Sequence, residues 1–361
     1  MQRMDGAMTN TETSGGMIQQ TVSALQNESG NHGTKFLVIR FSSIGDIVLT
    51  TPVIRCLKKQ VAGAEVHFLT KENFKNLVAD NPYVDKVQTL GYDWDMMIQQ
   101  LQNEKYDYII DLHHNLRTLR IKRALHGVMH FSFDKLNIRK WLLTALKINR
   151  MPKIHIVDRY LNTLKHFNVV NDGKGLDYFY PAKDRIKDKD LPMSHIHGYV
   201  GIVVGAALNT KKLPLHKLQE LCRLIEYPIV LLGGPEDRTD GGMIASIDPI
   251  RIYNACGKFS LNESAELVKY AKVIVTHDTG LMHIAAAFKK PVISIWGNTV
   301  PEFGMTPYYG DAAVAHQIFE IKDLWCRPCS KIGYDKCPLR HFKCMELQDM
   351  QKIKETVESY L

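Results

Sequence analysis

The sequence feature that most constrains the fold is an alternation of short apolar runs with helical patterns, which the chain repeats in two series. Strand-like runs of the first series lie at residues 35–41, 66–69, 84–90 and 108–112, and those of the second at 200–204, 228–232, 251–254, 273–275 and 292–296. Helical patterns lie at 44–60, 74–78, 94–104, 116–125, 138–146, 158–167, 215–225, 243–247, 261–270 and 281–288. Nearly continuous apolar strands that alternate with helices are typical of parallel sheets covered on both faces.

The alternation therefore predicts an α/β fold with two facing, doubly wound, Rossmann-like domains of parallel sheet. A chain of 361 residues suits about two domains of ordinary size. We place the N-terminal domain at 34–180, a linker at 181–198, the C-terminal domain at 199–330, and a Cys-containing segment with a helix at 331–361. Residues 1–33 show no period and read as a disordered leader.

The positive charge is concentrated in one part of the chain. The formal net charge is +8, and residues 113–150 hold many cations against a single acid, Asp134. This excess indicates either an ordinary, slightly basic protein or an anionic partner, such as nucleotide phosphates, an acidic glycan or a membrane face. Nucleic acid ranks last, because the interleaving of aromatic and basic residues that is typical of RNA-binding surfaces is absent.

No targeting or membrane-spanning segment is visible in the sequence. No apolar run approaches the roughly 18 residues that span a bilayer. The N-terminal residues lack the charged-then-apolar layout of a signal peptide. We therefore expect a cytoplasmic protein.

The first candidate site is RFSSIGDIVLTTP, residues 40–52, which reads as a strand end, a turn and the start of a helix. Open α/β sheets bind ligands at such turns, and Gly45 would let a ligand approach the backbone closely. Asp46 is either a carboxylate that stabilises the helix N-terminus or a general base at the mouth of a cleft between the domains. The stretch lacks GxGxxG, so a standard dinucleotide fingerprint is not supported.

The second candidate site is VIVTHDTGLMHIAAAFKKPVISIWG, residues 273–297, where a buried strand delivers Asp278, Thr279 and Gly280 to the start of a helix. The free backbone N–H groups and the positive end of the helix dipole form an anion site that suits a diphosphate. His283 lies in the first turn and would donate to the same anion. The alternatives are that Asp278 or Thr279 only caps the helix and that His283 is structural.

Two further turns follow strand ends in the second series. VGAALNTKKLP, residues 204–214, carries Lys211 and Lys212, which are either a solvated pair or cations that neutralise a leaving phosphate. LLGGPEDR, residues 231–238, carries Glu236, a candidate acceptor of hydrogen bonds from ribose hydroxyls. Each of these groups lies on a loop at the carboxyl end of a predicted strand.

In combination and order, these stretches resemble glycosyltransferase family 9, the heptosyltransferases that transfer heptose from ADP-heptose to the inner core of lipopolysaccharide. IRFSSIGDIVLTTPVIRCLKK is similar to the family's N-terminal signature and THDTGLMHIAAAFKKPVISIWG to its C-terminal signature. The resemblance implies a GT-B fold, with the nucleotide-sugar donor in the C-terminal domain and the acceptor mostly in the N-terminal one. It also implies an inverting transfer that needs no divalent metal and no other cofactor.

The resemblance also implies roles for individual residues. Asp46 matches the general base on the acceptor hydroxyl, and Lys211 matches a phosphate-binding lysine, with the adjacent Lys212 leaving the register open. The residues that would hold the donor are Glu236 on the ribose, Asp278 on the sugar or phosphate, and Thr279, Gly280 and His283 on the diphosphate. The chain departs from the family at Ala206 and Ala207, where hydroxyl residues are common, and at Leu213, where Trp is common.

On the acceptor side we expect Ser43 and Gly45, together with Arg117 and Arg120 from DLHHNLRTLRIKR, residues 111–123. These cations suit a carboxylated or phosphorylated acceptor such as the Kdo–lipid A region, and a solvated basic helix face is the alternative. The resemblance implies a peripheral enzyme at the inner face of the cytoplasmic membrane. Two other functions stay open: a family member that uses another nucleotide sugar or envelope glycan, and a catalytically silent nucleotide-binding subunit.

Four of the 7 cysteines lie close together near the C-terminus: Cys326, Cys329, Cys337 and Cys344. Four thiolates form a candidate structural zinc site, with His341 as a competing ligand. Reduced, packed thiols are the alternative, and a reducing cytosol argues against a disulfide framework.

Overall fold

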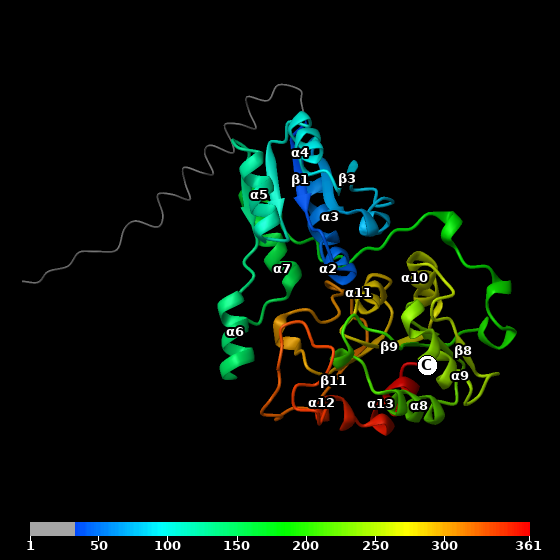
Figure 1. Cartoon of the computed structure of the whole chain (residues 1–361). Coiled ribbons are helices and arrows are strands. Elements are labelled where there is room, and N and C mark those ends of the chain that lie inside the picture. Colours follow the sequence, from blue (N-terminus) through cyan, green and yellow to red (C-terminus); the bar gives the residue numbers. More distant parts are fainter. Residues whose placement is uncertain (1–32) are drawn as a thin grey trace, which may run out of the picture.

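The computed structural model describes residues 33–361, which form two parallel α/β units (Figure 1). The disordered leader expected at residues 1–33 lies, except for its last residue, outside the described part of the chain. The first unit has a five-stranded sheet in the order β3-β2-β1-β4-β5, and the second has a six-stranded sheet in the order β11-β10-β9-β6-β7-β8. Neighbouring strands in both sheets run parallel. The predicted α/β class with two Rossmann-like sheets is confirmed.

The N-terminal unit is built on strands whose side chains are mostly buried on both faces. Its strands are β1 (Lys35–Ile39), β2 (Glu65–Lys71), β3 (Lys86–Leu90), β4 (Tyr108–Asp111) and β5 (Met129–Ser132). Its helices are α2 (Ile44–Val48), α3 (Thr51–Gln60), α4 (Trp94–Asn103), α5 (Leu116–Ala124), α6 (Asn137–Leu146) and α7 (Ile156–Leu161). Helix α3 packs Val53, Ile54 and Leu57 into the core, while α4 packs Met97, Ile98 and Leu101 into a second apolar cluster.

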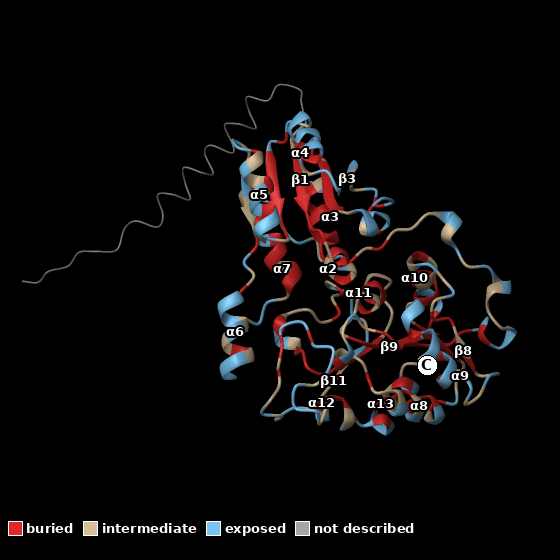
Figure 2. Cartoon of the chain, in the orientation of Figure 1, coloured by how far each residue is buried: buried red, intermediate tan, exposed pale blue. Residues whose placement is uncertain are grey.

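The C-terminal unit repeats the pattern with an additional strand. Its strands are β6 (Val200–Val203), β7 (Ile229–Leu232), β8 (Ile252–Asn254), β9 (Val273–His277), β10 (Val292–Trp296) and β11 (His316–Glu320). Its helices are α8 (Leu215–Leu224), α9 (Arg238–Ala245), α10 (Leu261–Tyr270), α11 (Gly280–Ala287), α12 (Lys343–Glu346) and α13 (Met350–Glu358). The central strands are buried and the outer helix faces are exposed (Figure 2).

Most predicted elements are present, and the differences have local causes. The helix predicted at 44–60 is two helices, α2 and α3, because Pro52 lies in the first turn of α3, where proline favours a new start. The pattern at 74–78 is part of a 3-10 helix, Glu72–Leu77. Strands β5 and β11 were not predicted; both are sheet edges whose side chains are mostly half-buried or exposed, so their sequences lack a continuous apolar run.

The two units are in direct contact. Helix α7 meets the segment after β10, where the Ile156 amide donates to the Gly304 carbonyl at 2.8 Å. The segment 171–186 passes from the N-terminal unit onto α10, and the Tyr178 hydroxyl donates to Asn262 Oδ1 at 2.7 Å. Buried Arg55 in α3 holds the start of this segment through ion pairs with Asp172 and Asp177. None of the helices in the described part of the chain has the length and apolar character needed to cross a bilayer.

Candidate active site

Asp46, Lys211 and Asp278 lie after the carboxyl ends of strands that border the switch point of each sheet. Such a point is where strands on either side connect in opposite directions, and it is where open α/β sheets bind ligands. In the N-terminal sheet it lies between β1 and β4, and in the C-terminal sheet between β6 and β9. The turn after β1 carries Asp46, the turn after β6 carries Lys211, and the turn after β9 carries Asp278.

The turn after β1 and the turn after β9 touch each other, although they are far apart in the sequence. A Cβ atom on Gly280 would lie 2.7 Å from Ile44 Cγ2, and one on Gly45 would lie 2.6 Å from His283 Cδ2. Helices α2 and α11 therefore contact each other at Gly45 and Gly280, at the junction of the two units (Figure 1). The contact brings the predicted base and the predicted anion site together.

Asp46 is held by donors from its own turn and by a buried arginine. Its Oδ1 lies 2.7 Å from Arg40 Nη2, and its Oδ2 accepts from the Ser43 hydroxyl at 2.9 Å and the Ser43 amide at 3.2 Å. Burial opposes ionisation of this carboxyl, but the Arg40 charge and the Ser43 donors together lower its pKa below the ordinary value. Asp46 is therefore ionised at neutral pH and fixed in orientation.

Arg40 is itself fixed by the surrounding backbone. Its Nε donates to the Ser42 carbonyl at 2.7 Å, and its Nη1 donates to the Leu112 carbonyl at 2.6 Å and the Tyr160 hydroxyl at 2.9 Å. The sequence alone had assigned no role to Arg40. The available signal was a cation at the end of an otherwise apolar strand, directly before the glycine turn.

The turn after β9 presents an uncapped helix start. Thr279 is the N-cap residue of α11, but its side chain makes no capping hydrogen bond; its hydroxyl lies 3.2 Å from that of Thr276. His283 is buried, and Nδ1 of its ring has no hydrogen-bond partner among residues 33–361. Burial lowers the pKa of His283 to about 4, so this imidazole is neutral at physiological pH. The turn offers backbone N–H groups and a neutral imidazole to an anion.

Lys211 reaches this turn across the switch point. Its Nζ lies 2.6 Å from Asp278 Oδ2, which also accepts from the Thr299 hydroxyl at 3.0 Å. The carboxylate thus holds the ammonium beside the start of α11. This pairing brings Lys211, Asp278, Thr279, Gly280 and His283 into one cluster.

Lys212 and Glu236 are placed differently. Lys212 Nζ lies 2.7 Å from Oδ1 of Asp237, a buried carboxylate whose Oδ2 accepts the Gly234 amide. The charge of Lys212 is therefore used to neutralise a carboxylate under the β7 turn. Glu236 is exposed on that turn, beside Gly234. Its role and the donor role of Lys212 stay predictions.

The predicted acceptor cations Arg117 and Arg120 lie on helix α5, and their contacts with an acceptor stay a prediction. Arg117 and Arg120 are exposed on α5, and the Arg120 guanidinium stacks 4.6 Å from the Trp94 ring centroid. Two other cations, Lys135 and Lys140 from the segment that follows β5, interact electrostatically with the Asp46 carboxylate. Ser43 and Gly45 lie in the Asp46 turn as predicted, and their contacts with an acceptor remain a prediction.

Half-buried Lys140 and buried Arg159 both contact Phe303, one at its ring and the other at its carbonyl group. Arg159 Nη2 donates to the Phe303 carbonyl at 3.2 Å, and Lys140 Nζ lies 5.8 Å from the Phe303 ring centroid. Burial, together with the charge of Arg159, lowers the pKa of Lys140 to about 8. Nε and Nη1 of Arg159 are buried without a hydrogen-bond partner in the described part of the chain. The sequence reading listed Lys140 only as part of the basic region and did not single out Arg159.

Two more buried polar groups near the junction lack partners. Both side-chain polar atoms of Asn298, which follows β10, are buried and make no hydrogen bond within the described residues. His113 follows β4, and its Nδ1 is likewise unpaired. Burial, followed by the charges of Arg40 and Lys135, lowers the pKa of His113 to about 4. Buried polar atoms normally have partners, so these atoms mark the places where a ligand would supply them.

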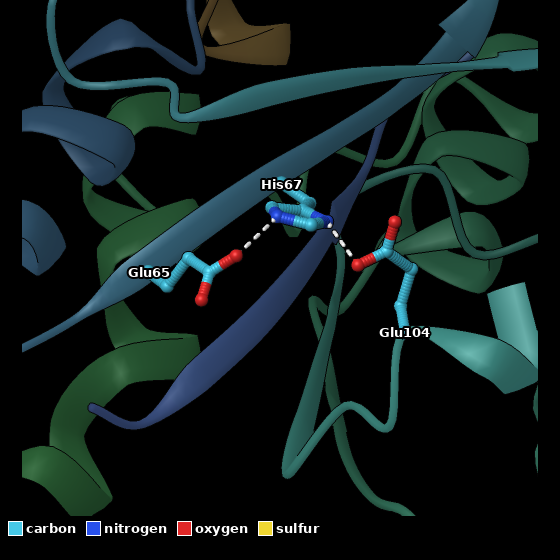
Figure 3. Close-up of side chains that lie close together, drawn as sticks. All are labelled: Glu65, His67 and Glu104. Carbon is cyan, nitrogen blue, oxygen red and sulfur yellow. Dashed lines mark hydrogen bonds and ion pairs between the residues drawn. The ribbon is translucent and has the colours of Figure 1, made fainter. Parts of the chain in front are cut away.

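One cluster of possible metal ligands lies at the other end of the N-terminal sheet (Figure 3). Among residues 33–361, Glu65, His67 and Glu104 form a group whose ligand atoms lie within 4.8 Å of one another. Lys35 Nζ, however, lies 3.1 Å from Glu65 Oε1 and 3.2 Å from Glu104 Oε2, and Lys86 also pairs with Glu104. The lysines already neutralise both carboxylates, so the cluster is a satisfied ion-pair network.

The four C-terminal cysteines lie near one another as free thiols: Cys326, Cys329, Cys337 and Cys344. Cys326 Sγ lies 3.8 Å from His341 Nε2. Burial raises the pKa of Cys344 to about 12, and the other three thiols add to this effect. They do not form a group with ligand atoms within 4.8 Å of one another, unlike the Glu65 cluster. Whether they bind zinc remains a prediction.

Comparisons with known proteins bear on the family of the chain. The model of "Glycosyltransferase family 9 (heptosyltransferase)" matches residues 94–336. Lipopolysaccharide heptosyltransferase 1 of Campylobacter coli is 26% identical over 302 residues, covering 77% of this chain and 86% of the relative.

Two solved structures have the same fold. The E. coli ADP-heptose lps heptosyltransferase II superposes with a TM-score of 0.68 at 18% identity, over 91% of this chain and 98% of that one. The E. coli heptosyltransferase WaaC with ADP superposes with a TM-score of 0.66 at 20% identity, over 91% and 100%.

Proposed function

The chain belongs to glycosyltransferase family 9, the heptosyltransferases, and on that premise we propose that it transfers heptose from ADP-heptose to the inner core of lipopolysaccharide. It is a glycosyltransferase with a GT-B fold. The observation that carries the proposal is the contact between the Asp46 turn and the start of α11. This contact supports the proposal because it holds the Asp46 carboxylate beside the start of α11, where we propose that the diphosphate binds.

This arrangement suits a single in-line displacement at the anomeric carbon. We assign Asp46 as the general base that takes the proton of the acceptor hydroxyl. The start of α11, His283 and Lys211 would stabilise the negative charge of the departing ADP. Because one step with attack opposite the leaving group inverts the anomeric centre, the product would have the inverted configuration. Since protein groups supply the positive charge, we propose that transfer needs no divalent metal.

The acceptor would lie against the cations beside Asp46. Arg159 is buried, Lys135 and Lys140 are half-buried, and the salt bridges of the described residues include no carboxylate partner for any of the three. An unpaired buried charge is costly, and an anionic acceptor would remove that cost. The carboxylates and phosphates of a Kdo–lipid A region carry the required charge. Such an acceptor would place the enzyme at the inner face of the cytoplasmic membrane.

Product analysis tests the proposal directly. Incubating the protein with ADP-heptose and a truncated, heptose-free lipopolysaccharide should yield ADP and a product heavier by one heptose, with inverted anomeric configuration by NMR. The rate should be unchanged after treatment with EDTA. Asp46→Asn should lower kcat by about 10²–10⁴-fold, the usual contribution of a positioned base, without loss of ADP binding.

A matched control is Asp95→Asn, which removes an exposed carboxylate from the first turn of α4 and should leave kcat unchanged. Full activity of Asp46→Asn would overturn the assignment of the base. Binding of ADP without transfer to any core acceptor would instead support a silent nucleotide-binding subunit. Transfer from a different nucleotide sugar, with none from ADP-heptose, would retain the reaction class and reject the donor.

A further inference from the structure

Helix α6 exposes an apolar face that no other part of the described chain covers. It projects from the body of the molecule, and most of its surface is exposed (Figures 1 and 2). Its inner side is anchored by Leu143, which packs with Val300 and Phe303. Ile138, Trp141 and Ala145 lie on the opposite side, spaced three and four residues apart. An exposed helix face of this kind marks an interaction surface.

Further exposed apolar side chains lie in the residues that follow α6 and in the segment 325–332. Lys147 Nζ, at the end of the helix, donates to the Cys326 and Pro328 carbonyls at 3.2 and 2.7 Å, so the segment 325–332 lies alongside. We call the exposed apolar side chains of both segments the docking patch. Its members and their exposed fractions are Ile138 (76%), Trp141 (52%), Leu146 (53%), Ile148 (45%), Trp325 (75%) and Ile332 (68%).

Cations predominate around the α6 part of the docking patch, whereas Asp323 and Asp335 are exposed close in sequence to Trp325 and Ile332. Residues 135–157 contain no Asp or Glu. Arg139 on α6, and Arg150 and Lys153 in the segment that follows, are exposed beside the patch. A helix with exposed Trp, Ile and Leu, flanked by Lys and Arg, is typical of an element that lies in a membrane interface. Tryptophan prefers the headgroup level of a bilayer, and each cation near an anionic surface adds to the attraction.

We propose that the docking patch binds the surface of an anionic phospholipid bilayer. Ile138 and Trp141 would enter the interface, and Arg139, Arg150 and Lys153 would contact lipid phosphates. The choice of a membrane over another partner rests on the proposed function, because its acceptor is anchored in lipid. Lys140 supports this geometry, since it extends from the same helix toward Asp46 and Arg159. Docking through α6 would therefore hold the acceptor side of the site at the membrane.

Vesicle co-sedimentation of the full chain tests the proposal. Wild-type protein should bind vesicles that contain phosphatidylglycerol, bind phosphatidylcholine vesicles at least tenfold more weakly, and dissociate as salt is raised. The double variant Ile138→Ser/Trp141→Ser should bind anionic vesicles at least tenfold more weakly than wild type. The control Ile250→Ser removes a side chain that is 80% exposed in the C-terminal unit, and it should bind like wild type. Thermal unfolding of each variant checks that it is folded.

Transfer assays separate this proposal from the proposed function. The double variant should keep wild-type kcat on a deacylated, water-soluble acceptor and lose at least tenfold in rate on an acceptor embedded in vesicles. Vesicle binding without transfer by wild type would reject the proposed function and leave the docking patch intact. Equal vesicle binding by wild type and the folded double variant would overturn the docking patch. So would a wild-type dimer that becomes monomeric in the double variant, since a second copy would then be the occupant.

Discussion

Substitution of Gly280 by alanine tests whether the contact between the two glycine turns is needed for transfer. The backbone of Gly280 is not left-handed, so an alanine is allowed by conformation and only its surroundings oppose it. The new Cβ would lie 2.7 Å from Ile44 Cγ2 and 2.9 Å from Ile44 Cβ, whereas ordinary contacts begin at 3.4 Å. Helices α2 and α11 would therefore have to separate by about 0.7 Å, the difference between 3.4 and 2.7 Å.

The expected cost appears mainly in the kinetics. Overpacking of this kind destabilises a fold by about 1–3 kcal/mol, and the better helix propensity of alanine offsets up to about 1 kcal/mol of that. A misplacement of close to 1 Å between reacting groups costs roughly 10²-fold in rate. We therefore expect kcat/KM of Gly280→Ala to fall about 10- to 100-fold, with a small change in melting temperature.

The assay combines steady-state transfer with calorimetric ADP binding and thermal unfolding. The matched control is Gly242→Ala in α9, where the nearest atom to the new Cβ is Asn254 Nδ2 at 4.0 Å. This control should gain up to about 1 kcal/mol in stability and keep wild-type kcat/KM. Wild-type kcat/KM in Gly280→Ala would refute the reasoning, because the base and the anion site would then tolerate separation.

The remaining predictions concern the charges of the site. Replacing Arg40 by glutamine removes the cation that lowers the pKa of Asp46; the pKa should rise, so the acidic limb of the kcat/KM profile should move to higher pH, while Arg40→Lys should move it less. Lys211→Met should raise KM for the donor with little effect on stability. Lys212→Met leaves the buried Asp237 carboxylate unpaired, so it should destabilise the fold by about 3 kcal/mol with kcat retained. If Lys212→Met instead raised KM for the donor and Lys211→Met destabilised the fold, Lys212 would be the phosphate-binding lysine and Lys211 the structural one. Metal analysis of the purified protein tests whether the four C-terminal thiols bind zinc. Because no three of their sulfur atoms lie within 4.8 Å of one another, we expect less than one zinc per chain. One zinc per chain would contradict this.

The main lines of the fold were accessible from sequence because the central strands are buried on both faces. Strands such as β4 and β9 have every side chain buried, which demands continuous apolar runs, and such runs are visible without a structure. The edge strands β5 and β11 carry exposed side chains and leave no such run. These two segments are strands because they pair with β4 and β10, and such pairing is not visible in their own sequences.

The turns that carry the candidate site could be predicted from the sequence, but the ion pairs between their side chains could not. Glycine and a carboxylate after an apolar strand are local signals, so Asp46 and Asp278 could be named. The partners of Lys211 and Lys212 depend on which strands lie beside β6. Because β9 is on one side of β6 and β7 on the other, Lys211 pairs with Asp278 after β9 and Lys212 pairs with Asp237 after β7. Arg159 escaped notice because its position beside Phe303 depends on contact between the two units.

The ion pairs also indicate how the anion site accommodates a donor. On its proposed role, Lys211 would have to share or give up its contact with Asp278 when a donor diphosphate binds. Asp278 also accepts from Thr299 at 3.0 Å, so its carboxylate stays in place when the ammonium moves. Asp46 likewise remains paired with Arg40 at 2.7 Å. Asp46 and Asp278 thus each keep a donor of their own, Arg40 and Thr299, so Lys211 is the cation that we expect to move toward the departing diphosphate.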